Sequence, residues 1–218
     1  MPDTPKPGRP HSLGIHTWVS TVAALIALAF STYNFLDGLP DPPQTEVAPP
    51  RLIRMDWHKK NHALSVFIQP SVSTRVETDT VEVITDARLT LTPVGGAKGT
   101  PSPVPHFFWQ QAVKWSYDKG SGDIFFTYLA DPAPFSVIRD EPQLPSLHFT
   151  ALDWTPTASA LKGTLMLHRA SGQDPIGLPV CIRLQDPDVT SLTGTEGYRE
   201  FRSDVPGKPS DGCYHWFG

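Results

Sequence analysis

The hydrophobic residues of this chain first gather in one long run near its start. Trp18 to Leu36 contains 19 residues, mainly Ala, Leu, Val, Ile and aromatic residues, and the segment from Pro10 to Leu36 lacks Asp, Glu, Lys and Arg. At about 1.5 Å per residue, a helix of this length extends over about 28 Å, close to the thickness of the hydrocarbon core of a bilayer. The run therefore predicts a transmembrane helix over residues 17–36.

The residues on either side of this helix predict its orientation. Lys6 and Arg9 precede it and the next basic residue is Arg51, and basic residues near a span favour the cytoplasmic side. We expect a disordered cytoplasmic tail at residues 1–16, because this short segment is rich in Pro. Residues 37–50 contain five Pro and predict an extended stalk outside the membrane.

A cleaved signal peptide is the alternative interpretation of the apolar run. Ala27-Leu28-Ala29 offers a cleavage site of small residues, and cleavage there would release a secreted binding module. The hydrophobic residues continue beyond this site through Phe30 and Phe35. This continuation favours an uncleaved anchor.

From residue 51 onwards, hydrophobic and polar residues alternate with a period of two, the pattern of half-buried strands. Such alternation occurs at Ala160–Ala170 and Leu178–Asp186. It also occurs at 79–93, where Ile84 is the single exception to one apolar face: Val81, Val83, Ala87, Leu89 and Leu91. Two segments are apolar on both phases and predict central strands covered on both sides: Ala63–Gln69 and Asp123–Ala130.

Weaker strand signals occur at six further segments, separated by turns rich in Gly, Pro, Asp and Ser: Leu52–Trp57, Gln111–Tyr117, Phe135–Arg139, Leu147–Leu152, Tyr198–Arg202 and Cys213–Phe217. About nine to eleven short strands predict a mainly β fold, with a β-sandwich of the immunoglobulin-like or jelly-roll-like kind over residues 51–218. A β-barrel is the alternative. The 24 Pro and 16 Gly residues agree with few helices, since both residue types weaken a helix.

The charge of the external domain argues against one class of partner, and its two cysteines predict a disulfide. Residues 37–218 carry 16 Lys and Arg against 21 Asp and Glu, which argues against nucleic acid as a partner, since its binding depends on cationic side chains. Cys181 falls on the polar phase of its predicted strand. A disulfide to Cys213 would therefore tie the C-terminal tail to the outside of a sheet. Two free, packed thiols are the alternative.

Motifs for a catalytic nucleophile, a phosphate-binding loop, a zinc site or an EF-hand are all absent from the sequence, so we expect no cofactor and no metal. We interpret His58 and His62 as part of a solvated turn, with a metal site as the alternative. Asp186 and Asp188 are interpreted as part of a polar turn that contains Pro, with a calcium site as the alternative. The basic segment Arg51–Lys60 is interpreted as the polar face of a first strand, with contact to anionic lipid or cell-wall polymer as the alternative.

Aromatic and small residues give two candidate contact surfaces. Five aromatic residues outside the apolar run fit core packing, the commoner use, or an exposed patch that binds sugar rings or a protein: Trp109, Trp115, Tyr117, Tyr214 and Trp216. Within the run, Ala23, Ala27 and Ser31 recur every four residues. Such a face lets helices approach closely and would allow a homodimer.

Together these patterns predict a single-pass protein of the bacterial inner membrane, with a periplasmic or extracellular β-domain that binds a partner protein or an envelope polymer. Neither Asn34 nor Asn61 begins a glycosylation sequon, which agrees with a bacterial origin. A membrane-tethered hydrolase acting on envelope material is the less favoured alternative. Its first candidate residues are Asp123, His148 and Asp153, which flank predicted strand ends.

Overall fold

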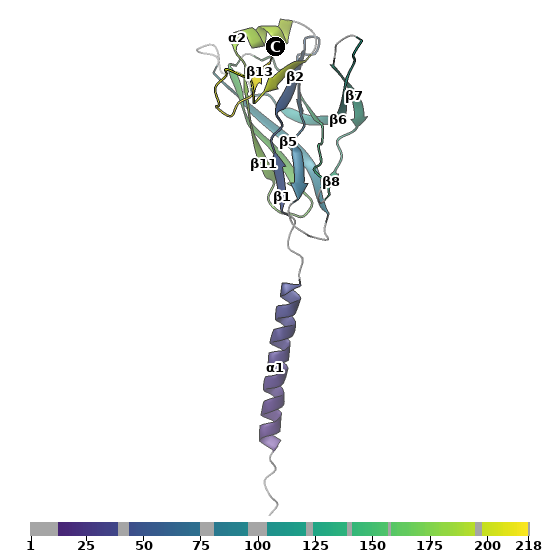
Figure 1. Ribbon diagram of the computed structural model, residues 1–218, viewed down its shortest axis with the longest axis vertical. Coiled ribbons are helices and arrows are strands. Elements are labelled where there is room, and N and C mark those ends of the chain that lie inside the picture. Colours follow the sequence, from purple (N-terminus) through teal and green to yellow (C-terminus); the bar gives the residue numbers. More distant parts are fainter. Residues whose placement is uncertain are drawn as a thin grey trace, which may run out of the picture. The chain divides into compact units, whose positions relative to one another are not determined.

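The computed structural model of the chain describes residues 13–38, 44–74, 81–95, 104–120, 124–138, 141–156, 158–194 and 198–217. The chain divides into two units, Met1–Asp41 and Pro42–Gly218. The first unit contains helix α1, Leu13–Asp37, and the second contains the strands (Figure 1).

Helix α1 confirms the predicted apolar helix and starts earlier than expected, at Leu13. Its described side chains, from Trp18 onwards, are exposed, and the mean hydropathy of Trp18–Asp37 is 1.6. Within the described ranges it is the one helix long and apolar enough to span a bilayer, a property that a signal sequence shares. Residues 13–16 are helical rather than part of a disordered tail, and residues 1–12 lie outside the described residues.

The predicted stalk at residues 37–50 is wrong for its second half. Thr45–Ala48 forms strand β1, which pairs antiparallel with β4, Ser71–Thr74. The carbonyl of Pro50 accepts a hydrogen bond from the Tyr214 hydroxyl at 2.6 Å. These bonds make the segment part of the folded domain, because a paired strand can no longer adopt polyproline geometry. Residues 39–43 of the stalk lie outside the described residues.

Two larger antiparallel sheets make up most of the domain and confirm a mainly β fold. The four-stranded sheet has the order β11-β10-β5-β8, and the seven-stranded sheet has the order β13-β12-β2-β3-β9-β6-β7. None of the described strands closes either sheet into a barrel. The bounds are β2 Leu52–His58, β3 Ala63–Ile68, β5 Glu82–Val94, β6 Phe107–Tyr117, β7 Ile124–Ala130, β8 Phe135–Val137, β9 Leu147–Ala151, β10 Ala160–Arg169, β11 Ile176–Arg183, β12 Arg199–Arg202 and β13 His215–Trp216.

Both larger sheets contribute side chains to one hydrophobic core. The seven-stranded sheet supplies Ile53, Met55, Val66, Phe149 and Phe201, and the four-stranded sheet supplies Ala87, Leu89, Leu165, Leu167 and Val180. On β3 and β9, the side chains that alternate with this core set point to the opposite face, called the outer face from here on: Ser65, Phe67, His148 and Thr150. All four are buried, which confirms the prediction of a doubly covered strand at Ala63–Gln69 for β3.

The alternation predicted for β5 is confirmed from Ala87 onwards and wrong before it. Glu82 and Ile84 are buried, whereas Val81 is exposed. The ladder between β5 and β10 leaves Thr85 as an extra residue, which is a β-bulge. One extra residue shifts the alternation by one position, so the residues before the bulge that face the core are Glu82 and Ile84 instead of Val81 and Val83. The apolar Ile84 on the polar phase of the sequence is therefore the sign of the bulge.

Strand β7 lies at the edge of its sheet, so the prediction of a central, doubly covered strand at Asp123–Ala130 is wrong. Among the described strands it pairs with β6 alone. Phe125, Tyr128 and Leu129 are 49%, 59% and 63% exposed. A strand that is apolar on both phases is normally covered on both sides, but these side chains of β7 are not covered.

The predicted polar turn around Asp186 and Asp188 is also wrong, because helix α2, Asp186–Gly194, starts there. Pro187 lies in the first turn, where a helix needs no backbone donor, and Gly is common at helix ends. Leu192 is fully buried and fixes the helix to the core. Helix α2 lies at one end of the domain and β1 at the other (Figure 1).

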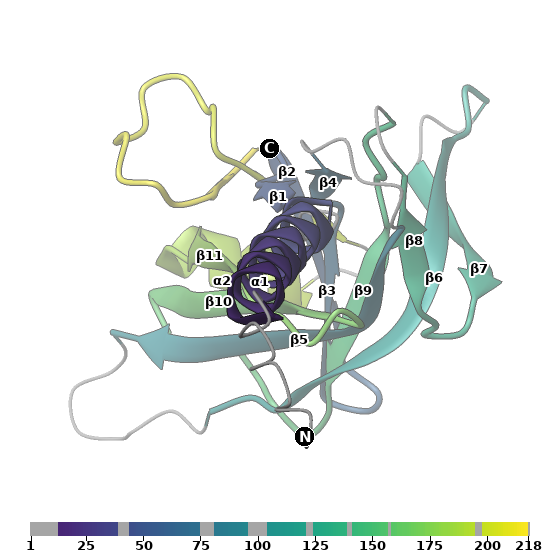
Figure 2. The same cartoon turned by 90° about the horizontal axis from the view of Figure 1, so that it is seen from below.

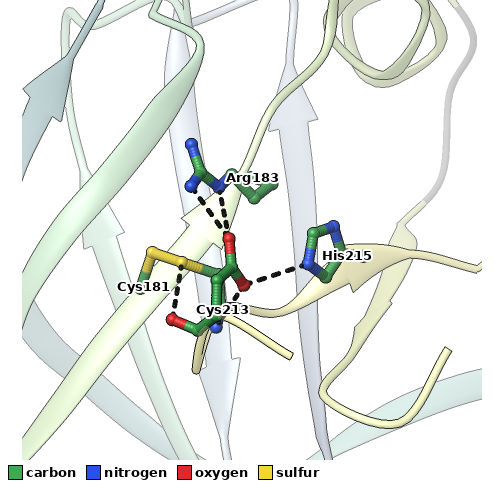
Figure 3. Close-up of a disulfide and its surroundings, with 5 residues drawn as sticks. Cys181, Arg183, Cys213 and His215 are labelled. Carbon is green, nitrogen blue, oxygen red and sulfur yellow. Dashed lines mark hydrogen bonds and ion pairs between the residues drawn. A yellow bond between two sulfur atoms is a disulfide. The ribbon is translucent and has the colours of Figure 1, made fainter. Parts of the chain in front are cut away.

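The predicted disulfide between Cys181 and Cys213 is present, and it fixes the C-terminal tail to β11 (Figure 3). The Tyr214 N–H donates to the Cys181 carbonyl at 2.7 Å. The Asp211 carboxylate accepts hydrogen bonds from the Arg183 guanidinium at 2.8 and 3.0 Å and from the Cys213 N–H at 3.0 Å. Arg183, followed by the Cys213 N–H, lowers the pKa of Asp211 to about 2.

Candidate functional site

The outer face of the seven-stranded sheet carries an open groove of about 650 Å³, called the outer groove from here on. Strands β3, β6 and β9 form its floor, and the turn between β2 and β3 borders it. Its neutral polar lining consists of Asn61, Ser65, Gln110, Gln111, His148 and Thr150. Phe108, Phe126 and Leu152 supply apolar surface.

Three polar side chains lie deep in this groove although they belong to the outer face of a sheet. Ser65, His148 and Thr150 are 2%, 4% and 5% exposed. Strand β6 is bent along its length (Figure 2). Aromatic neighbours cover His148 on this face, since the Phe67 ring stacks on its imidazole and the Phe126 ring lies 5.9 Å from it between centroids.

A β-bulge in β6 brings two consecutive glutamines to the groove. The ladder between β6 and β9 skips Gln110 immediately before the pair of Gln111 and His148. Successive residues of a regular strand point to opposite faces, and the extra residue removes that alternation. Gln111 therefore hydrogen-bonds to His148 while Gln110 hydrogen-bonds to Thr150, two side chains on the same face.

These four side chains form a continuous hydrogen-bond chain at the bottom of the groove. The amide nitrogen of Gln111 lies 3.1 Å from His148 Nδ1, which accepts its N–H. The neutral imidazole then carries its proton on Nε2 and donates to Thr150 Oγ1 at 3.3 Å. The Thr150 hydroxyl in turn donates to the amide oxygen of Gln110.

An aromatic cluster beside the groove holds the His148 ring in place. The ring of Phe67 stacks on the His148 imidazole with 4.2 Å between centroids, and Trp115 contacts Phe67 edge-on at 5.0 Å. The Arg54 guanidinium lies 4.4 Å from the centroid of Trp115 and forms an ion pair with Glu200 at 2.9 Å. These contacts make a second, smaller packed layer that supports the floor of the groove.

Charged groups are confined to the end of the groove near the turn between β2 and β3. His58 Nε2 lies 3.3 Å from the Asp56 carboxylate, and Lys60 is exposed in the turn. His58 and His62 lie in or beside an exposed turn, as predicted. In the part of the chain that the structure describes, no group of three or more His, Cys, Asp or Glu side chains could hold a metal ion.

The five aromatic residues predicted as core or patch occupy different environments. Tyr214 is buried, and burial raises the pKa of its hydroxyl to about 12, so an exposed role is wrong for this residue. Trp109 and Trp216 are half-buried against the core. Trp115 lies in the aromatic cluster, and the side chain of Tyr117 lies outside the described residues.

The three candidate residues of a hydrolase do not form a catalytic group in the described structure. His148 bonds to Gln111 and Thr150, and Asp153 lies in an exposed loop with a φ of 52°. No hydrogen bond joins Asp153 to His148 among the described residues, and Asp123 is outside them.

A scan against protein-family models, a search of curated proteins and a search of solved structures each found no match.

Gln110, Gln111 and Thr150 were missed by sequence reasoning, because they carry no charge and belong to no motif. The pair "QQ" inside a strand, followed by Ala112, interrupts the expected alternation of β6. That interruption is the signal of a bulge. It does not reveal that both side chains reach the same groove, which depends on the pairing of β6 with β9.

Burial of His148 predicts a loss of stability in acid. Burial, and then the charge of His58, lowers the pKa of His148 from 6.5 to about 4. The unfolded chain therefore binds the extra proton first, and stability falls as the pH drops from about 6.5 towards 4. Between pH 7 and pH 4 this group should cost about 3 kcal/mol of unfolding free energy.

Urea unfolding of the full chain in detergent at both pH values measures this loss. His148→Asn cannot gain a charge, so its loss of stability should be smaller than that of the parent by about 3 kcal/mol. His106→Asn, at an exposed position before β6, serves as the matched control and should behave like the parent. Equal pH dependence of the His148→Asn variant and the parent would contradict the assignment.

Proposed function

We propose that this chain is a single-pass protein of the bacterial inner membrane whose external β-domain binds a neutral, polyhydroxylated envelope polymer in the outer groove. The apolar and exposed surface of α1 supports the anchor. Lys6 and Arg9 before it support a cytoplasmic N-terminus and a periplasmic domain. A β-sandwich of the immunoglobulin-like or jelly-roll-like kind is the arrangement we infer for the two larger sheets, since both bury side chains in one core.

The hydrogen-bonding capacity left over in the two glutamines carries the proposal. Gln110 uses its amide oxygen toward Thr150, and Gln111 uses its amide nitrogen toward His148. Among the described residues, neither the Gln110 amide nitrogen nor the Gln111 amide oxygen has a side-chain hydrogen-bond partner. A donor and an acceptor on neighbouring residues suit adjacent hydroxyl groups of a sugar, since each hydroxyl both donates and accepts.

The remaining lining of the groove fits the same ligand class. His148 is neutral above a pH of about 4, so the centre of the groove carries no charge at neutral pH. Phe108 and Leu152 are about half exposed and offer apolar surface to the C–H faces of sugar rings. An open groove admits a polymer, whose chain must continue beyond both ends of the site.

Cosedimentation of the detergent-solubilised full chain with insoluble envelope polysaccharide tests this function, with a soluble neutral glucan as competitor. Gln110→Ala and Gln111→Ala should each weaken binding about tenfold, the effect of about 1.4 kcal/mol expected for one lost hydrogen bond. Gln173→Ala, in the turn between β10 and β11, is the matched control and should bind like the parent. Unchanged binding by both groove variants, or no binding by the parent, would refute the proposal.

A further inference from the structure

The edge strand β7 carries an unusual combination of exposure and apolar composition. Residues 124–130 contain no charged residue and no Pro, and Phe125, Tyr128 and Leu129 are about half exposed or more. Natural proteins usually protect an edge strand with charged residues, Pro, a bulge that twists it away or a covering element. The strand β7 has neither charge nor Pro to discourage the addition of another strand. Its ladder with β6 leaves Leu129 as an extra residue, so the one irregularity lies near the end of the strand and the part before it is regular.

We propose that β7 is a self-association surface, on which β7 of a second copy of this chain pairs antiparallel across a two-fold axis. The sequence of β7 has the composition of a strand covered on both sides, yet in the single chain it pairs with β6 alone among the described strands. The missing neighbour would supply that cover and would satisfy the hydrogen-bonding groups on the free edge.

The strand is complementary to itself, which favours a second copy over an unrelated partner. In a two-fold pairing, a residue near the centre lies opposite itself and its neighbours lie opposite each other. The register centred on Thr127 pairs Phe126 with Tyr128 and Phe125 with Leu129, so only apolar, aromatic and hydroxyl side chains meet over the central positions. Pairs of this kind stabilise antiparallel strands, and like charges do not meet.

The apolar surface continues beyond the strand itself. A groove of about 540 Å³ at the end of β7 is lined largely by apolar residues, among them Leu129, Ala130, Phe135 and Leu144, and also by Lys114 and Asp131. Leu129 and Leu144 are 63% and 58% exposed. A second copy paired along β7 would bring its own exposed side chains next to this groove and bury part of this surface.

The membrane anchor raises the local concentration of the external domains, and this part of the inference alone rests on the proposed function. Two copies held in one membrane meet at a much higher effective concentration than free domains, so an edge of modest affinity would suffice. The small-residue face of α1, Ala23, Ala27 and Ser31, would allow a homodimer through the other unit of the chain as well.

Oxidative crosslinking of the full chain in membranes tests the pairing. Thr127→Cys places a thiol at the centre of β7, and Thr90→Cys, an exposed threonine of β5, is the matched control. Thr127→Cys should form a covalent dimer on non-reducing gels, and Thr90→Cys should form at least tenfold less. No excess dimer from Thr127→Cys, or a crosslink from this position to a different protein, would overturn the inference.

A second measurement tests the pairing of β7 without introducing a cysteine. Light scattering of the full chain in nanodiscs sized for two copies should give a dimer for the parent and for Leu129→Met, and a monomer for Leu129→Lys, which places like charges on the shared edge. A parent that is monomeric, or a Leu129→Lys variant that stays dimeric, would refute the β7 interface. Binding of envelope polysaccharide is a separate readout, so failure of the dimer leaves the groove proposal intact.

Discussion

Replacing both Cys181 and Cys213 with serine should lower the free energy of unfolding by about 4 kcal/mol. The two cysteines are 32 residues apart, and opening a loop of this size gives the unfolded chain about that much additional conformational freedom. The loop contains α2 and β12, so the unfolded chain gains freedom over a substantial part of the domain. This should be among the largest single effects in the protein.

Urea unfolding of the full chain in detergent, with and without a reductant, measures the contribution of the disulfide. Reduction of the parent should reproduce the stability of the double serine variant. Asp211→Asn is a useful control, because it weakens the Arg183 contact while leaving the covalent link in place. That variant should still lose stability on reduction. A change of less than about 1 kcal/mol in both the reduced parent and the double variant would contradict the expected role of the link.

Gly163→Ala should destabilise the domain by about 3 kcal/mol, at the upper end of the cost of over-packing. A Cβ atom at this position would lie 1.7 Å from the Thr90 carbonyl oxygen. Strand β10 lies between β5 and β11, so its backbone cannot move away from one neighbour without disturbing the other ladder. The clash is with backbone, which cannot rotate away as a side chain can.

Gly177→Ala provides the matched comparison on the adjacent strand β11. Its added Cβ would meet the Met166 sulfur at 3.2 Å and a Thr164 methyl at 3.4 Å. Methionine adapts easily, so this variant should remain within about 1 kcal/mol of the parent. Thermal and urea unfolding of the two variants measure the difference. Equal stability of Gly163→Ala and Gly177→Ala would show that β10 relaxes more than its central position implies.

Alternation along the sequence predicted most of the strands because each half-buried strand shows its burial locally. Ala87, Leu89 and Leu91 are buried in β5, as the period of two requires. The prediction failed before Ala87 because Thr85 is an extra residue in the ladder with β10. A bulge depends on the partner strand, and the partner lies more than 70 residues away in the sequence.

The composition of a strand does not reveal its place in a sheet. The strands β3 and β7 have the same apolar character on both phases, yet β3 is fully buried and β7 is exposed at an edge. Sequence order cannot distinguish them, because the position of each strand follows from pairing with distant segments. We attribute the apolar surface of β7 to pairing with a second copy of the chain.

The candidate site was less predictable than the fold. His148 is a candidate hydrolase residue by its position near a predicted strand end. In the structure it bonds to Gln111 and Thr150, and no hydrogen bond joins it to an acidic residue among the described ones. Its actual neighbours, Gln111 and Thr150, have neutral side chains that occur on any protein surface. They become a site only because β6 bulges and pairs with β9, which brings residues 37 positions apart into hydrogen-bond contact.

Hydrogen–deuterium exchange of the full chain, with and without the envelope polysaccharide, tests the outer groove most directly. We expect slower exchange in peptides covering β6 and β9, where Gln110, Gln111, His148 and Thr150 lie, and no change in β11. The Gln111→Ala variant should lose this protection under the same conditions. Polysaccharide that protects other segments, or protects β6 and β9 equally in the variant, would contradict the account.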